Sequence, residues 1–77
     1  MGVLRVMDRR KGDVAVKWTV GDEKSQQKAK AAFDLAKGLG FTAFAFPTTE
    51  AGAEGKVVRE FDPAAELIVS TPQIAGG

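Results

Sequence analysis

The stretch VAVKWTVGDEKSQQKAKAAFDLAKG, residues 14–38, changes its periodicity once, and this change decides the fold. Up to Val20, apolar side chains recur at every second position, which is typical of a strand with one buried face. After Gly21 and Asp22, the apolar positions recur at intervals of three and four, which is typical of an amphipathic helix. The stretch therefore predicts a strand that ends at Val20 and a helix that begins at Glu23.

The predicted helix carries recognisable start and stop signals. Asp22 suits the N-cap, and Glu23 stands in the first turn, where the helix dipole favours an acidic side chain. Lys37 followed by Gly38 predicts the C-terminal end. Alanines dominate the apolar stripe and Phe33 is its main anchor, so we expect the helix to lie close to a sheet. The stripe consists of Ala29, Ala32, Phe33 and Ala36.

Short apolar runs bounded by turn residues predict the remaining strands. The predicted strands cover residues 3–7, 14–20, 41–46, 56–61 and 67–71. Pro47 and Pro72 end the third and the fifth strand, because proline cannot donate to a ladder. Asp62 and Pro63 suit the first two positions of a type I turn. Residues 48–55 are small, polar and acidic, which predicts a loop.

The order strand, strand, helix, strand, strand, strand predicts an α+β fold, with one helix on one face of a mixed sheet of four or five strands. If the last strand inserts beside the first, the result is the β-grasp arrangement. Trp18 lies on the alternating face of the second strand and is expected in the core.

The third strand is apolar on both faces, while only one helix is available to cover the sheet. We expect Phe44 and Phe46 to lie mostly in the core. Ala43 and Ala45, or an exposed Phe41, could then leave a partner-binding patch on the open face of the sheet.

The charge is unevenly distributed along the chain. Residues 1–37 carry nine Lys or Arg and five Asp or Glu, whereas residues 38–77 carry two and five. A basic first half could bind an acidic partner. The candidates are Arg9, Arg10 and Lys11, in the charged loop between the first two strands, which could contact phosphate or an acidic enzyme surface. The alternative is that this run only keeps the hairpin solvated.

Composition removes several kinds of chemistry. The 77 residues include no histidine, cysteine or tyrosine, so the commonest general base and thiolate metal ligands are missing. We expect a chain that is not an enzyme and binds no cofactor or metal. No apolar run approaches the ~20 residues of a membrane span, and the N-terminus does not look like a signal peptide. We expect a cytoplasmic protein that has no membrane partner. We also expect no nucleic-acid partner, because the sequence offers no aromatic platform on which bases could stack.

The last predicted strand leads into a tail that ends in Gly76-Gly77. The segment 61–77 resembles the end of the small subunit of molybdopterin synthase, where an acidic turn precedes an apolar strand and a Pro-Pro-Val-x-Gly-Gly type tail. With its element order, the chain thus resembles the ubiquitin-like β-grasp proteins, which include ubiquitin and the bacterial sulfur carriers. Gln73 replaces the second proline, and the arginines that precede the glycines of ubiquitin are missing.

The resemblance implies a ubiquitin-like domain over residues 1–72 and an extended tail over 73–77. It implies that a partner adenylating enzyme of the ubiquitin-activating type uses ATP and Mg²⁺ to activate the carboxylate of Gly77. A thiol, a sulfide or a lysine amine of a downstream target would then attack the activated carbonyl. Glycine suits this position because it has no side chain to block the attack. The tail residues that the partner would recognise are Ile74, Ala75 and Gly76.

Several alternatives stay open. A glycine-rich end can be a frayed terminus without a function. The chain could instead be a non-enzymatic interaction module or a structural subunit of a virion or other assembly, with a docking tail. A small nucleic-acid binder that uses the basic half would show affinity that falls steeply with salt. The residues do not separate protein conjugation from sulfur carriage.

Overall fold

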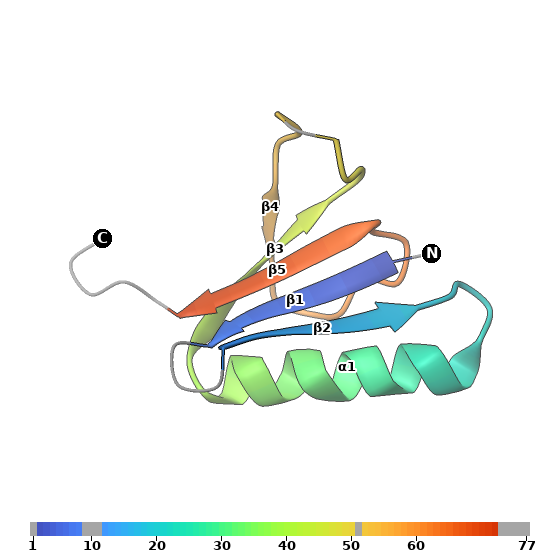
Figure 1. Cartoon of the computed structure of the whole chain (residues 1–77), viewed down its shortest axis with the longest axis horizontal. Coiled ribbons are helices and arrows are strands. Elements are labelled where there is room, and N and C mark those ends of the chain that lie inside the picture. The colour runs from blue at the N-terminus through green and yellow to red at the C-terminus, as the bar shows by residue number, and fades with distance from the viewer. Residues whose placement is uncertain (1, 9–11, 51, 73–77) are drawn as a thin grey trace.

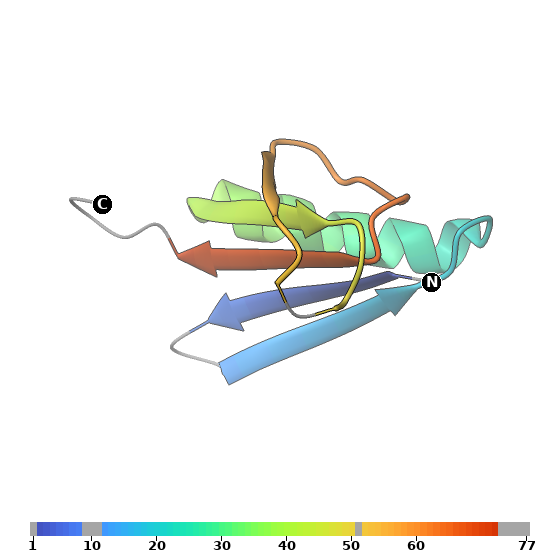
Figure 2. The same ribbon diagram turned by 90° about the horizontal axis from the view of Figure 1, so that it is seen from above.

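The computed structural model describes residues 2–8, 12–50 and 52–72. In order, the elements are β1 (Gly2–Asp8), β2 (Gly12–Trp18), α1 (Glu23–Gly38), β3 (Phe41–Phe46), β4 (Lys56–Val58) and β5 (Leu67–Pro72). The five strands form one sheet in the order β2-β1-β5-β3-β4, and α1 packs against one side of it (Figures 1 and 2). We call this side the covered face and the other side the open face. The predicted α+β fold with one helix on a mixed sheet is confirmed.

The last strand lies in the middle of the sheet. β5 pairs in parallel with β1, where Leu4 lies opposite Ile68, and antiparallel with β3, where Ala45 lies opposite Ile68. The last strand thus lies beside the first, which is compatible with the β-grasp arrangement. β5 is one residue longer than expected, because Pro72 is still in register with Phe41.

The core lies between α1 and the covered face. Its largest fully buried side chains come from β1, β2, β5 and α1. They are Leu4, Trp18, Phe33 and Ile68. Two buried alanines of α1, Ala29 and Ala36, let the helix approach the sheet closely, as the alanine-rich stripe predicts. Trp18 is also fixed by a hydrogen bond, since its Nε1–H donates to the carbonyl oxygen of Pro63 at 3.0 Å.

Two strands end earlier than their sequence patterns predict. β2 ends at Trp18, and the chain then turns, with the N–H of Asp22 donating to the carbonyl oxygen of Thr19 at 3.0 Å. β4 ends at Val58 rather than at Phe61. The aromatic ring of Phe61 packs edge-on against Trp18, with ring centres 4.9 Å apart, so this segment leaves the sheet to join the core.

The ends of α1 differ from their predicted signals. Asp22 occupies the N-cap position, but its side chain makes no capping hydrogen bond. Instead, the Oγ of Ser25 accepts from the N–H of Thr19 at 2.9 Å. The helix continues through Gly38, and Gly40, with φ at +91°, provides the left-handed residue that ends it.

The expected assignment of the two faces of β3 is wrong. Ala43 and Ala45 are buried beneath α1, whereas Phe44 and Phe46 are only half-buried and lie on the open face. Phe41 shares the face of the alanines and is half-buried. The reason is the register with β5, which places Ala45 beside the fully buried Ile68.

Candidate functional site

The open face presents apolar side chains from four strands. Side chains at alternate positions of β1, β3, β4 and β5 reach it, because successive residues of a strand point to opposite faces. They are Val3, Met7, Phe44, Phe46, Val57, Leu67 and Val69. In Figure 2 the helix lies behind the sheet, so this face is turned toward the viewer.

The strand register gathers these side chains into two neighbouring rows. In one row, Val69 lies between Arg5 on β1 and Phe44 on β3, and Phe44 lies opposite Val57 on β4. In the next row, Leu67 lies between Val3 and Phe46. The two rows therefore form one continuous patch with β5 at its centre. We call it the open-face patch.

The residues of the open-face patch retain contact with water. Val57 keeps 62% of its surface exposed, and Met7 is also exposed. Phe44, Leu67 and Val69 are half-buried by their neighbours in the sheet. Contiguous exposed apolar surface of this kind typically marks an interaction site.

Positive charge borders the open-face patch on the side of β1 and β2. Arg5 stands directly beside Val69, and Lys17 stands beside Val3. Both side chains are exposed. Asp13 is the acidic residue of β2 on the same face. A partner that combines an apolar centre with an acidic border on this side would fit the patch.

Three of the site residues predicted from the sequence lie within the described part of the chain, and none of them belongs to the open-face patch. Ala43 and Ala45 lie beneath α1, and Phe41 is on their side of the sheet, so the prediction that these three form an open-face patch is wrong. The small alanines are covered because the helix lies close to them. Outside the described residues lie Arg9, Arg10, Lys11, Ile74, Ala75, Gly76 and Gly77.

The sequence does not predict the aromatic and aliphatic residues that the open face presents. Large aromatic side chains are usually buried, so the pattern places Phe44 in the core. For Leu67 and Val69 it predicts only a strand. Their alternation with Ile68 and Ser70 was the available signal, but alternation does not tell which of the two faces meets the helix.

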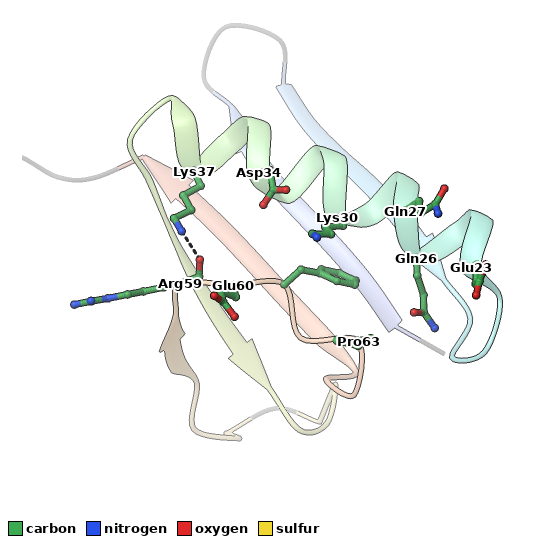
Figure 3. Close-up of a pocket in the computed structure, with 10 residues that line it drawn as sticks. Glu23, Gln26, Gln27, Lys30, Asp34, Lys37, Arg59, Glu60 and Pro63 are labelled. Carbon is green, nitrogen blue, oxygen red and sulfur yellow. Dashed lines mark hydrogen bonds between the residues drawn. The ribbon is translucent and has the colours of Figure 1, made fainter.

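A concave surface lies between α1 and the connection from β4 to β5 (Figure 3). This groove has a volume of about 760 Å³, and acidic and basic side chains alternate along it. The charged residues that line it are Glu23, Lys30, Asp34, Lys37, Arg59 and Glu60. The Nζ of Lys37 donates to the carbonyl oxygen of Arg59 at 2.6 Å, which ties the two walls together. The mixed charges give the groove no clear preference for an anion or a cation.

A smaller hollow of about 490 Å³ lies beside the ends of β3 and β4. Small side chains such as Ala45, Ala53 and Ala64 line it, so the hollow arises where no large side chain fills the space. Across the described ranges, no group of three or more metal-ligating side chains comes together. None of the helical segments in these ranges has the length and apolarity to cross a membrane.

Comparison of the chain with protein-family models, with curated proteins and with solved structures gave no match.

Proposed function

We propose that this chain is a ubiquitin-like β-grasp carrier, which other proteins bind through the open-face patch and which a partner enzyme activates at Gly77. The chain would act as a substrate and carrier rather than as a catalyst. The partner would be an adenylating enzyme of the ubiquitin-activating type that brings ATP and Mg²⁺, and a downstream target would accept the activated carrier.

The position of β5 is the observation that supports this proposal most. β5 supplies Leu67 and Val69 to the centre of the open-face patch, and the same strand ends at Pro72. Gly77 lies five residues further along the sequence. Five extended residues can span at most roughly 17 Å. A partner that grips the open-face patch would therefore hold its catalytic site within reach of Gly77.

The chemistry requires a free carboxylate on Gly77. Attack of this carboxylate on the α-phosphorus of ATP would form an acyl-adenylate and release pyrophosphate. A thiol, a sulfide or a lysine amine would then attack the carbonyl carbon and expel AMP. The product would be a thioester, a thiocarboxylate or an isopeptide, respectively. Neither Gly76 nor Gly77 has a side chain that could obstruct the nucleophile.

The test is ATP–pyrophosphate exchange with an adenylating enzyme from the same genome. We expect exchange that depends on the chain and disappears when Gly76 and Gly77 are deleted. Val69→Asp should weaken exchange by raising the concentration of chain needed for half-maximal rate, because it places a charge in the centre of the open-face patch. The proposal would be contradicted if the deletion variant supported exchange as well as the full chain.

A matched variant separates the patch from general surface charge. Ala31→Asp introduces the same side chain at an exposed position of α1 and should leave the exchange unchanged. Intact mass spectrometry of the protein from its native host supplies an independent check. A terminal thiocarboxylate or a lysine isopeptide at Gly77 is expected, and finding only free carboxylate beside an active enzyme would argue against the proposal.

A second function is favoured by the open-face patch itself. The chain could be a non-enzymatic interaction module that binds its partner through this surface without any reaction at Gly77. In that case, a chain that ends at Pro72 would bind the partner with unchanged affinity, whereas Val69→Asp would abolish binding. Isothermal titration of the two variants against a captured partner distinguishes this function from the carrier.

A further inference from the structure

The connection between β4 and β5 separates two concave surfaces, and its central residues 59–64 are here called the strap. Phe61 and Pro63 line the groove on the side of α1. Asp62 and Ala64 line the smaller hollow beside β3 and β4. The side chains of this single segment thus face both concave surfaces, so there is open space on either flank of the strap.

Few hydrogen bonds hold the main chain of the strap in place. Apart from the tight turn over residues 62–65, it is held in the described ranges by two hydrogen bonds, and side chains donate both. At one end, the Nζ of Lys37 donates to the carbonyl oxygen of Arg59 at 2.6 Å (Figure 3). At the other, the Nε1–H of Trp18 donates to the carbonyl oxygen of Pro63 at 3.0 Å. A segment with so few ties is typical of a unit that opens locally.

The apolar anchor of the strap is one aromatic ring. Phe61 packs edge-on against Trp18, with ring centres 4.9 Å apart, and against Phe33 at 6.2 Å. Trp18 and Phe33 are fully buried, whereas Phe61 is half-buried and retains contact with water. Withdrawal of the Phe61 ring would therefore leave a ring-sized space against two other aromatic side chains.

We infer that the strap opens as a unit while the sheet and α1 stay folded, and that the ring of Phe61 is its plug. Opening uncovers a binding site whose walls include Trp18 and Phe33. The ligand is a small uncharged aromatic molecule, because an aromatic ring fills this space in the closed form and aromatic rings pack favourably edge to face. A ligand that binds only the open form makes that form more populated. The site is separate from the open-face patch and does not rest on the proposed activation of Gly77.

Hydrogen exchange tests whether the strap opens independently of the sheet. Trp18 is the only tryptophan of the chain, so its indole N–H gives a single NMR signal. The Ile68 amide in the central strand serves as the reference for global unfolding. Below the unfolding transition, the indole exchange rate should depend little on urea and the Ile68 rate steeply, because local opening exposes little surface.

Two matched variants test the tie at the beginning of the strap. Lys37→Met removes the donor to Arg59 and should speed the exchange of the Trp18 indole about fivefold, the effect of one lost hydrogen bond. Lys30→Met removes a lysine from the same groove but leaves this tie intact, so the indole exchange should stay unchanged.

Toluene, an uncharged ring of the size of a phenylalanine side chain, is the probe of the binding site. In Phe61→Ala, toluene should show nuclear Overhauser effects to the indole ring of Trp18. Its affinity should be about tenfold higher than for the unaltered chain, because no plug has to be displaced. Phe46→Ala removes another half-buried ring and should give no such gain at Trp18. Phe61→Leu repeats the comparison if the alanine variant is unfolded.

Three outcomes would overturn the inference. An indole exchange rate that follows the Ile68 rate at every urea concentration would show that the strap opens only when the whole protein unfolds. Equal affinity of toluene for the unaltered chain and a folded Phe61 variant would show that this ring is not the plug. The absence of any contact between toluene and Trp18 in a folded Phe61 variant would show that no aromatic site forms.

Discussion

Both faces of the sheet are apolar, but they differ in the size of the residues that β3 contributes. Beneath α1, β3 presents the buried Ala43 and Ala45, whereas on the open face it presents the half-buried Phe44 and Phe46. The rings of Trp18, Phe33 and Phe61 already fill the space between α1 and the sheet, and β3 adds only small side chains there. The larger side chains of β3 are therefore on the face that remains available to a partner. Apolar size along a strand does not by itself identify the covered face.

The two faces should differ most in the free energy of unfolding that is lost when a phenylalanine of each face is removed. Phe33→Ala removes a fully buried ring that packs beside Phe61, and should lower the free energy of unfolding by about 3–5 kcal/mol. Phe44→Ala removes a ring that is half-exposed, and should cost about 1–2 kcal/mol. Urea denaturation followed by circular dichroism measures both. Equal losses would show that the open face is covered in solution.

A second comparison concerns two glycines, each of which lies against an aromatic ring. A Cβ on Gly2 would come within 2.1 Å of the buried Trp18 ring, and one on Gly55 within 2.6 Å of the Phe46 ring. Gly2→Ala should cost about 1–3 kcal/mol, because Trp18 has no room to move. Gly55→Ala should cost less than about 1 kcal/mol, because Phe46 can turn toward water. Thermal unfolding of both variants tests this order, and a larger loss for Gly55→Ala would reverse the comparison.

The smallest expected difference lies within β4, between two adjacent valines. Val58 packs against the core, and Val57 points to the open face. Val58→Ala should cost about 1–2 kcal/mol, while Val57→Ala should stay within about 0.5 kcal/mol. Because both residues are in one strand, their intrinsic strand preferences cancel. Paired denaturation curves measure the difference. A greater loss for Val57→Ala would mean that Val57, and not Val58, packs against the core.

Local patterns predicted the elements of this fold well. The change of period after Val20 identified β2 and α1, and the alanines of the helix predicted its close approach to the sheet. The position of Trp18 in the core also followed from alternation. These features depend on residues that are near one another in sequence, so the sequence contains the information directly.

Features that depend on distant residues were predicted less well. The early end of β4 reflects the packing of Phe61 against Trp18 and Phe33, which belong to other elements. The orientation of β3 depends on its register with β5, for which the sequence of β3 alone gives no signal. The sequence therefore predicts the wrong residues of β3 for the open face, namely the alanines instead of Phe44 and Phe46.

The central position of β5 has a consequence for the order in which the chain can fold. During synthesis, the hairpin of β1 and β2, the helix, and then β3 and β4 are made before β5. Until Leu67–Pro72 is added, no strand joins the pair β1–β2 to the pair β3–β4. Contacts between the two ends of the chain also slow folding, because they close a long loop. A nascent chain that lacks β5 thus has two separate halves of a sheet, and the complete open face first forms after the last strand has been made.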